Sequence, residues 1–250
     1  MKAMTQIPQN RQSASPDRLE RVLDDGVLRV GTTMDTPVFS MRSASGELEG
    51  FDMDALETLA KALGVRIEYV KMTFGTMLPD LLADKFDLAM SGMGRTLDRA
   101  RVATFSKPYM RYGKLMMIRS ADKERFKTLA DLDKSGLKIA YNRGGLNDRF
   151  AHTEFKQASP TGYPNNELAT ADLLAGKVDA QVQDSTAAIY RARMNPALTA
   201  VSPEHVFNRV YVAALLRRED QTLLNYVNIW IDQIDMDGTL AQIRTKWLGN

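Results

Sequence analysis

The chain has 250 residues, of which 44% are hydrophobic, so it can bury a sizeable core in one large domain or in two ordinary ones. Its 33 Lys and Arg residues nearly balance its 31 Asp and Glu residues, and this balance argues against a nucleic-acid partner. The absence of cysteine excludes disulfides and thiol nucleophiles, and two histidines without cysteine argue against a dedicated transition-metal site.

The N-terminal segment is polar. Residues 1–17 contain no apolar stretch of the kind that forms the centre of a secretory signal, and we predict that they form a disordered leader. No run of about 18 apolar residues occurs in the chain, so no membrane span is predicted. The protein is therefore either cytosolic or a secretory protein from which the signal has been removed.

The first part of the chain alternates short apolar strands with amphipathic helices. Apolar residues recur at helical spacing across residues 50–64, where Asp52 is a candidate N-cap and Gly64 ends the pattern. A loop that follows a strand of such a sheet lies at its carboxyl edge, where ligands bind in open α/β folds. The other predicted elements are a helix at 19–23, strands at 27–31 and 67–70, and a helix at 77–82.

The chain is organised around residues 86–109, which begin as an apolar strand, break at two glycines and restart as a turn of helix. Gly92 and Gly94 allow a positive φ or a close approach of backbone to a ligand, and Thr96 is a candidate N-cap. An arginine inside that turn could hold a carboxylate through two parallel hydrogen bonds, and Arg99 and Arg101 are available there, with Arg95 in the loop itself. Arginines near the start of a helix are also commonly solvated surface charges, so the spacing alone leaves both interpretations open.

The second part of the chain repeats this arrangement of strand, glycine-rich loop and helix. A strand at 137–141 leads through Gly144 and Gly145 into the helix that contains Phe150, and Asp184 is placed to cap a later helix. Two such units would suit two lobes that face one cleft. The remaining predicted elements are strands at 110–118, 178–183 and 206–216, and helices at 129–132, 168–174, 184–193, 223–234 and 238–247.

Two segments of the central stretch carry a family resemblance. They are Ser91-Gly-Met-Gly-Arg-Thr-Leu-Asp-Arg99 and Ala103-Thr-Phe-Ser-Lys-Pro-Tyr109. They resemble the signature of type II periplasmic amino-acid-binding proteins, and the resemblance extends from about residue 18 to residue 248. It implies an α/β fold of two lobes, each a mixed sheet flanked by helices, joined by two hinge strands. We therefore expect a first lobe of residues 18–115 and 210–250, and a second lobe of residues 116–209, that close on a ligand.

The resemblance also implies a ligand site. Arg99 matches the arginine that binds the α-carboxylate of the ligand, and Asp184 matches the aspartate that accepts its α-ammonium, so the pair would clamp a zwitterion. Leu146 stands where the family usually has a threonine hydroxyl, which leaves backbone N–H groups at the helix start to complete the carboxylate site. The predicted ligand-binding residues are Arg99, Asp184, Gly92, Gly94, Thr96, Phe74, Gly145, Leu146, Phe39 and Met34, with no metal ligand and no cofactor.

Two functions follow from the resemblance. One is a periplasmic solute-binding protein that holds a small carboxylate ligand, an amino acid or a related organic acid, and serves the membrane component of an ABC transporter. The other is a carbon–oxygen lyase, because the chain also resembles the cyclohexadienyl dehydratase branch, which acts on prephenate or arogenate. That branch has a glutamate as general acid at the position of Ala187, and a tryptophan at that of Phe74. We therefore predict a binding protein without catalytic residues, with Asp148 and Glu154 as the first replacement acids to test.

Overall fold

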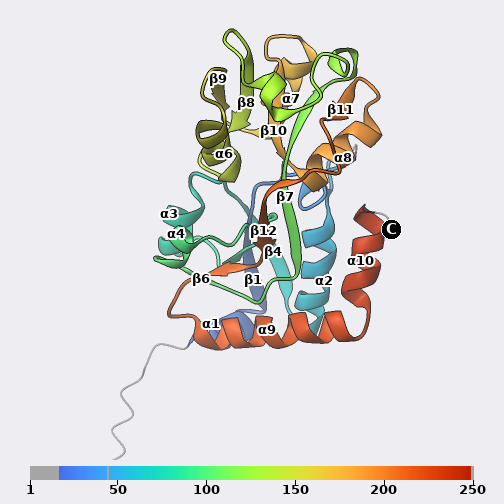
Figure 1. Ribbon diagram of the computed structural model, residues 1–250. Helices are drawn as coiled ribbons and strands as arrows, with labels where there is room; N and C mark the ends of the chain where they lie inside the picture. The colour runs from blue at the N-terminus through green and yellow to red at the C-terminus, as the bar shows by residue number, and fades with distance from the viewer. Residues whose placement is uncertain (1–16, 44, 249–250) are drawn as a thin grey trace, which may run out of the picture.

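Two β-sheets, each flanked by helices, divide the molecule into two lobes (Figure 1). The computed structural model describes residues 17–43 and 45–248. The predicted leader, residues 1–17, lies outside the described residues except for Asp17. That residue belongs to the first helix, because its side chain accepts a hydrogen bond of 3.0 Å from the Glu20 N–H and so caps the helix.

The first lobe is built on a mixed five-stranded sheet with the order β4-β1-β5-β13-β6. Its central strand β1 (Val27–Thr32) pairs in parallel with β4 (Arg66–Lys71) and with β5 (Leu88–Ala89). Two later strands, β13 (Leu215–Leu216) and β6 (Thr104–Phe105), complete the sheet in antiparallel pairing. The other elements are α1 (Arg18–Asp25), β2 (Met41–Arg42), β3 (Leu48–Glu49), α2 (Phe51–Leu63), α3 (Met77–Leu82), α4 (Leu97–Ala100), α9 (Gln221–Met236) and α10 (Thr239–Leu248).

The second lobe holds a six-stranded sheet with the order β11-β7-β10-β8-β9, in which β12 also pairs with β7. β10 (Ala180–Asp184) pairs in parallel with β8 (Lys138–Asn142), and β8 pairs in parallel with β9 (Ser159–Tyr163). β11 (Leu198–Ala200) lies antiparallel at the other edge. The helical elements are η1 (Ser120–Asp122), α5 (Leu129–Leu132), α6 (Leu146–Glu154), α7 (Asn166–Leu174) and α8 (Ser185–Met194).

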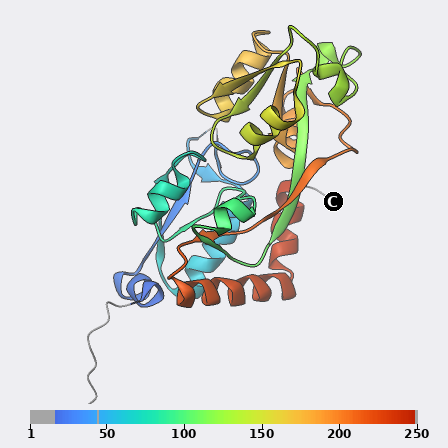
Figure 2. The same cartoon turned by 60° about the vertical axis from the view of Figure 1, so that its left-hand side comes forward.

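Two strands join the lobes. β7 (Met110–Arg119) runs from the first lobe along the length of the second, and β12 (Phe207–Val212) lies beside its lower half (Figures 1 and 2). The two strands pair antiparallel, with a shift of register between Phe207 and Val210. The chain then returns to the first sheet as β13, so the first lobe is made of two separate segments of the sequence.

The main helices and strands form where apolar periodicity predicted them, because each buries an apolar face, but the strand predicted at 206–216 is divided into β12 and β13. In α2 the buried residues include Met53, Leu56 and Leu59, and Gly64 ends the helix in the left-handed conformation, as predicted. Asp52, however, does not cap this helix. It lies one residue inside it, fully buried, and its carboxylate accepts hydrogen bonds from Gly92 N–H and from the Tyr109 hydroxyl. Within the described residues, no helix combines the length and the hydropathy that a membrane crossing requires.

Candidate ligand-binding cleft

A narrow cleft between the lobes collects side chains from both sheets. Its free volume is only about 10 Å³, roughly the room of one water molecule, so the side chains of the two lobes nearly fill it. It is lined by Thr36, Phe74, Arg99, Tyr112, Lys114, Asn142, Gly145, Leu146, Asn147, Asn166, Gln183 and Asp184.

Arg99 reaches this cleft from the first lobe. Its backbone N–H is accepted by the Thr96 hydroxyl at 3.3 Å, so Thr96 caps α4 as predicted and fixes the direction of the arginine. Arg99 is 8% exposed, and its guanidinium donates one hydrogen bond of 2.9 Å, to the Gly94 carbonyl. Within the described residues no carboxylate lies at ion-pair distance from it. Burial without an acid lowers the pKa of Arg99 from its ordinary value, which leaves a desolvated cation facing the cleft.

Asp184 reaches the cleft from the second lobe and already has a cationic partner. It lies opposite Lys114 in the antiparallel pairing of β10 with β7, and the Lys114 ammonium donates to its carboxylate. The lysine side chain is 3% exposed and also lies 5.0 Å from the centre of the Tyr112 ring. Asp184 stands at the N-cap of α8 but makes no capping hydrogen bond, because its side chain is turned to the lysine. The predicted acceptor for an α-ammonium is therefore occupied by a side chain of the protein itself.

Three amide groups that line the cleft have a buried polar atom without a hydrogen-bond partner. These atoms are Asn147 Oδ1, Asn166 Oδ1 and Gln183 Nε2. The other end of the Asn147 amide donates to Asn142 Oδ1 at 2.8 Å, which turns its free oxygen away from that partner. A buried polar atom without a partner costs about 1–3 kcal/mol, so three of them in one small cleft point to polar groups of a ligand.

The two predicted glycines lie behind the cleft rather than in its lining. Gly92 has a φ of 65°, as predicted, and its carbonyl accepts from the Tyr112 hydroxyl at 3.1 Å. A Cβ on Gly94 would lie 2.5 Å from Leu146 Cδ1, so this glycine allows a close approach of the second lobe. The side chain that fills this space is Leu146, at the position where the family usually has a hydroxyl.

Phe74, Gly145 and Leu146 line the cleft together with Arg99 and Asp184, whereas two other predicted residues lie elsewhere. Phe39 does not form a pocket wall. A tight turn with Thr36 N–H donating to the Ser40 carbonyl directs its ring into the core, where it packs against Phe51 and Tyr112.

Met34 lies in a wider outer cavity that opens between the same two lobes. This cavity has a volume of about 360 Å³ and shares Phe74, Asn142 and Asn166 with the inner cleft. Its charged lining residues are Asp35, Arg42, Lys71, Arg143 and Glu167. A ligand that enters between the lobes would pass this cavity before it reached Arg99.

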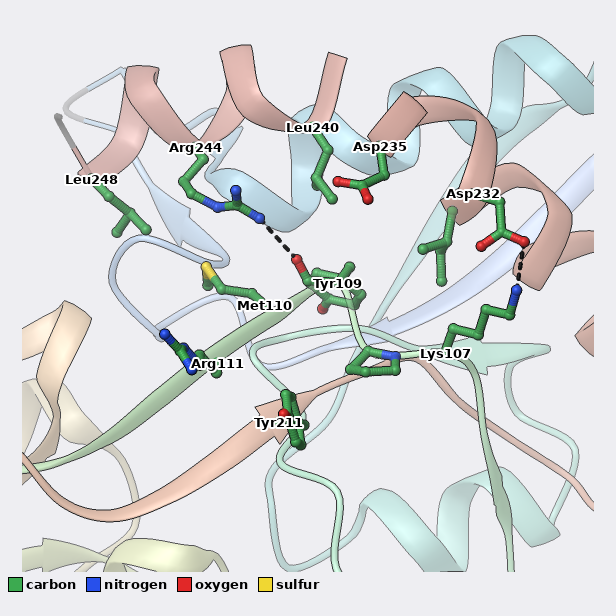
Figure 3. Close-up of a pocket in the computed structure, with 12 residues that line it drawn as sticks. Lys107, Tyr109, Met110, Arg111, Tyr211, Asp232, Asp235, Leu240, Arg244 and Leu248 are labelled. Atoms are coloured by element: carbon green, nitrogen blue, oxygen red, sulfur yellow. Dashed lines mark hydrogen bonds and ion pairs between the residues drawn. The ribbon is translucent and has the colours of Figure 1, made fainter. Parts of the chain in front are cut away.

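A larger groove of about 690 Å³ lies at the base of β7 against α9 and α10 (Figure 3). It contains none of the predicted ligand-binding residues. Lys107 pairs with Asp232 across it, and the Arg244 guanidinium donates to the Tyr109 carbonyl at 3.4 Å. The inner cleft, which brings Arg99 and Asp184 together, is therefore the better candidate for a site.

The acids considered as catalytic replacements lie outside the inner cleft. Asp148 accepts from the Gly144 N–H and pairs with His152, and Glu154 ends α6. Ala187 is buried in α8 and does not line the cleft. Asp184 is thus the only carboxyl group among the residues that line the cleft. The part of the chain that the structure describes contains no cluster of three potential metal-binding His, Cys, Asp or Glu residues.

Sequence reasoning missed the lysine and the amides of the cleft. Lys114 is a single charged residue in the buried part of an apolar strand, which was a signal that it needs a buried partner. Gln181 and Gln183 gave a similar signal, since both lie on a strand in which every residue is buried. The identity of the partner depends on strand register, which the sequence did not provide.

Comparison with known proteins agrees with this geometry. Residues 28–250 match the family of bacterial extracellular solute-binding proteins, family 3, and the chain belongs to this family. A cyclohexadienyl dehydratase of Pseudomonas aeruginosa is 37% identical over 235 residues, covering 94% of this chain and 87% of that protein. The ABC transporter arginine-binding protein 1 of Escherichia coli is 26% identical over 224 residues, covering 88% of this chain and 90% of that protein.

Among solved structures, the ancestral amino acid-binding protein AncCDT-1, described as a precursor of cyclohexadienyl dehydratase, superimposes with a TM-score of 0.87. It is 34% identical and covers 92% of this chain and 99% of its own. The fold is therefore the periplasmic-binding-protein type II fold that the sequence predicted. The relatives include both binding proteins and an enzyme, so the chemistry of the site has to decide between these functions.

Proposed function

We propose that the protein is a solute-binding protein that closes its two lobes on a small ligand carrying a carboxylate. The observation that carries this proposal is the buried guanidinium of Arg99, which faces the cleft without an acidic partner. An arginine in this position offers parallel N–H donors that match the two oxygens of a carboxylate. The family of the chain, whose named relatives bind arginine, cystine and histidine, supports the same function.

The proposal includes motion of the lobes. We divide the chain into a first lobe of residues 18–115 and 210–250 and a second lobe of residues 116–209, with β7 and β12 as hinge strands. A ligand cannot enter the closed cleft of about 10 Å³, so the lobes have to separate first. Few polar contacts would break on opening, among them the Arg149–Asp98 ion pair and a hydrogen bond of 3.4 Å from Asn166 N–H to Asp35.

A periplasmic location and an ABC transporter partner belong to the same proposal. They are supported by the extracellular character of the family and by relatives named as ABC transporter and periplasmic binding proteins. The partner would recognise the closed, liganded form, since only that form brings the two lobe surfaces together.

The test is a screen of small carboxylic acids against the purified chain by thermal unfolding. A ligand present at 100 times its Kd should stabilise the protein by about 2.7 kcal/mol. The stabilisation should disappear in Arg99→Met, whereas Arg95→Met, which changes an exposed arginine of the same loop, serves as the matched control. A screen of amino acids and organic acids in which nothing stabilises the folded protein would contradict the proposal.

A dehydratase-type lyase is the second candidate, because a cyclohexadienyl dehydratase is 37% identical to the chain. The cleft does not favour it. A general acid has to lie within hydrogen-bond reach of the leaving hydroxyl, and the one carboxyl group in the cleft lining already accepts a hydrogen bond from the Lys114 ammonium. Incubation with prephenate or arogenate, followed by ultraviolet detection of phenylpyruvate or phenylalanine, decides this point. Turnover that is lost in Arg99→Met would establish the lyase.

A further inference from the structure

We propose that the ligand is a hydroxy acid, with one hydroxyl beside its carboxylate and no α-ammonium group. This inference rests on the proposed function, because it names the class of ligand for the same cleft. It differs from the zwitterion that the resemblance implies. Two features of the cleft carry it: the Lys114–Asp184 pair, which sets the net charge of the lining and occupies Asp184, and the unpaired amide atoms, which can bind a hydroxyl.

The charge of the cleft suits a monoanion. Its charged lining residues are Arg99, Lys114 and Asp184, which together carry one net positive charge. A monocarboxylate without an amine would neutralise this charge. An amino acid is neutral overall, so it would leave the excess positive charge and add a third cation beside the two present. Like charges brought together in a desolvated site are strongly unfavourable.

The partner of Asp184 leaves no room for an ammonium. In the clamp that the resemblance implies, this carboxylate would accept the α-ammonium of the ligand. Here the Lys114 ammonium takes that place, held by the cross-strand register of β7 and β10. The lysine is 3% exposed, so its ammonium could give way to a ligand only by remaining buried without its counter-ion. The protein thus supplies an ammonium of its own where the ligand of a relative would bring one.

The unpaired amide atoms call for a group that both donates and accepts. Asn147 Oδ1 and Asn166 Oδ1 are acceptors, and Gln183 Nε2 is a donor. A hydroxyl can donate to one of the two oxygens and accept from the glutamine at the same time. A keto oxygen could accept from the glutamine but would leave both oxygens unsatisfied. Among uncharged substituents, a hydroxyl therefore fits this set of atoms better than a keto oxygen. An ammonium could donate to both amide oxygens, so the case against an α-ammonium rests on the Lys114–Asp184 pair.

Matched pairs of ligands test the inference, because each pair differs only at the α-substituent. We would measure Kd by calorimetry for malate against aspartate, glycerate against serine, 2-hydroxyglutarate against glutamate, and 3-phenyllactate against phenylalanine. In the pair whose skeleton binds best, the hydroxy acid should bind about tenfold more tightly or better. An amino acid that binds as tightly as its hydroxy partner overturns the inference and leaves the proposed function standing. If no member of any pair binds and the wider screen of amino acids and organic acids is also empty, the proposed function itself is contradicted. A ligand from that screen that carries an α-ammonium overturns the inference alone.

Lys114→Met tests the charge argument separately. This variant frees Asp184, and the two remaining charges of the cleft, on Arg99 and Asp184, then match a zwitterion. Its preference should move by about tenfold or more toward the amino acid of the pair. A folded Lys114→Met that keeps the wild-type preference overturns the inference. If the variant does not fold, because its buried carboxylate is left unpaired, the wild-type comparison of matched pairs still decides the matter.

Discussion

Arg18 and Arg99 are buried to almost the same extent, at 6% and 8% exposure, but they meet opposite surroundings. The Arg18 guanidinium pairs with Asp84 at 2.6 Å, Asp87 at 3.0 Å and Asp220 at 3.2 Å. The Arg99 guanidinium has the Gly94 carbonyl alone. Burial opposes the charge of Arg18, but the hydrogen bond to Asp84 and the surrounding acids raise its pKa, whereas burial lowers that of Arg99.

The difference separates a structural arginine from a binding one. Arg18 ties α1 to the loop before β5 and to the start of α9, and its charge is fully compensated within the protein. The fold gains nothing comparable from Arg99, which costs desolvation and lies between the lobes. A buried cation that has no acidic partner within the protein is expected where a bound ligand supplies the anion. The two arginines should therefore respond in opposite ways to the same substitution.

The largest loss of unfolding free energy caused by a substitution is expected for Arg18→Met. This substitution leaves Asp87 and Asp220, whose side chains are 1% and 5% exposed, with one cation fewer. Breaking a buried ion pair from one side costs about 3–5 kcal/mol of unfolding free energy, and we expect the lower end because other arginines still contact both acids. Urea denaturation measures it, with Arg66→Met on an exposed strand position as the control. A loss below about 1 kcal/mol would show that the network is not structural.

Asp52 extends the comparison to a buried acid whose hydrogen-bond partners are Gly92 N–H and the Tyr109 hydroxyl instead of an arginine. Burial raises its pKa from 3.8 to about 7, against the opposing hydrogen bonds from Gly92 and Tyr109. A carboxyl group with a raised folded-state pKa contributes stability below pH 4 that is lost as the pH rises through 7. Because Asn does not titrate, wild type should lose up to about 4 kcal/mol relative to Asp52→Asn between pH 4 and pH 8. Urea denaturation at pH 4, 6 and 8 that gave a constant difference would place the folded pKa near its ordinary value.

Arg99→Met should affect binding and spare the fold. Each charge-assisted hydrogen bond contributes about 1.5–3 kcal/mol, so the loss of two should raise the Kd for the best carboxylate at least about a hundredfold. The unliganded protein should be as stable as wild type or slightly more so, since an unpaired buried cation is removed. Calorimetry and urea denaturation of the same sample measure both quantities. Loss of stability without loss of affinity would show that Arg99, like Arg18, has a structural role and does not bind the ligand.

The smallest effect is expected for Asp98→Asn, which breaks the ion pair between Asp98 of the first lobe and Arg149 of the second. Arg149 lowers the pKa of Asp98 through a hydrogen bond and its charge, but both side chains are more than half exposed. Such exposed pairs contribute little, so the Kd should rise about threefold or less, and the difference should vanish in high salt. Calorimetry at low and high salt provides the measurement. A larger, salt-independent loss would mean that the pair holds the lobes closed.

The two arginines could not be told apart from the sequence. Apolar periodicity and glycine positions predicted the main helices and strands and the loop that carries Arg99. β9 and β11 were not predicted, because the segment of β9 contains Pro160 and Gly162, which are poor strand formers, and β11 has three residues. The acids around Arg18 come from distant parts of the chain.

In the cleft, too, contacts between distant parts of the chain could not be predicted from the sequence. Whether Asp184 faces the ligand or Lys114 depends on the register of β10 against β7, and a register is a property of the assembled sheet. Phe39 was placed in the pocket by resemblance, but the local turn between Thr36 and Ser40 sends its ring into the core. Long-range pairing and local turn geometry therefore decided the residues that the sequence misplaced.

A crystal structure with the tightest-binding carboxylate of the matched pairs tests the central claim most directly. The account predicts that the carboxylate lies between the closed lobes at about 2.7–2.9 Å from two nitrogens of the Arg99 guanidinium. The Lys114–Asp184 ion pair should remain intact beside it, as it is in this structure. A carboxylate bound elsewhere, with Arg99 still donating to the Gly94 carbonyl alone, would contradict the account.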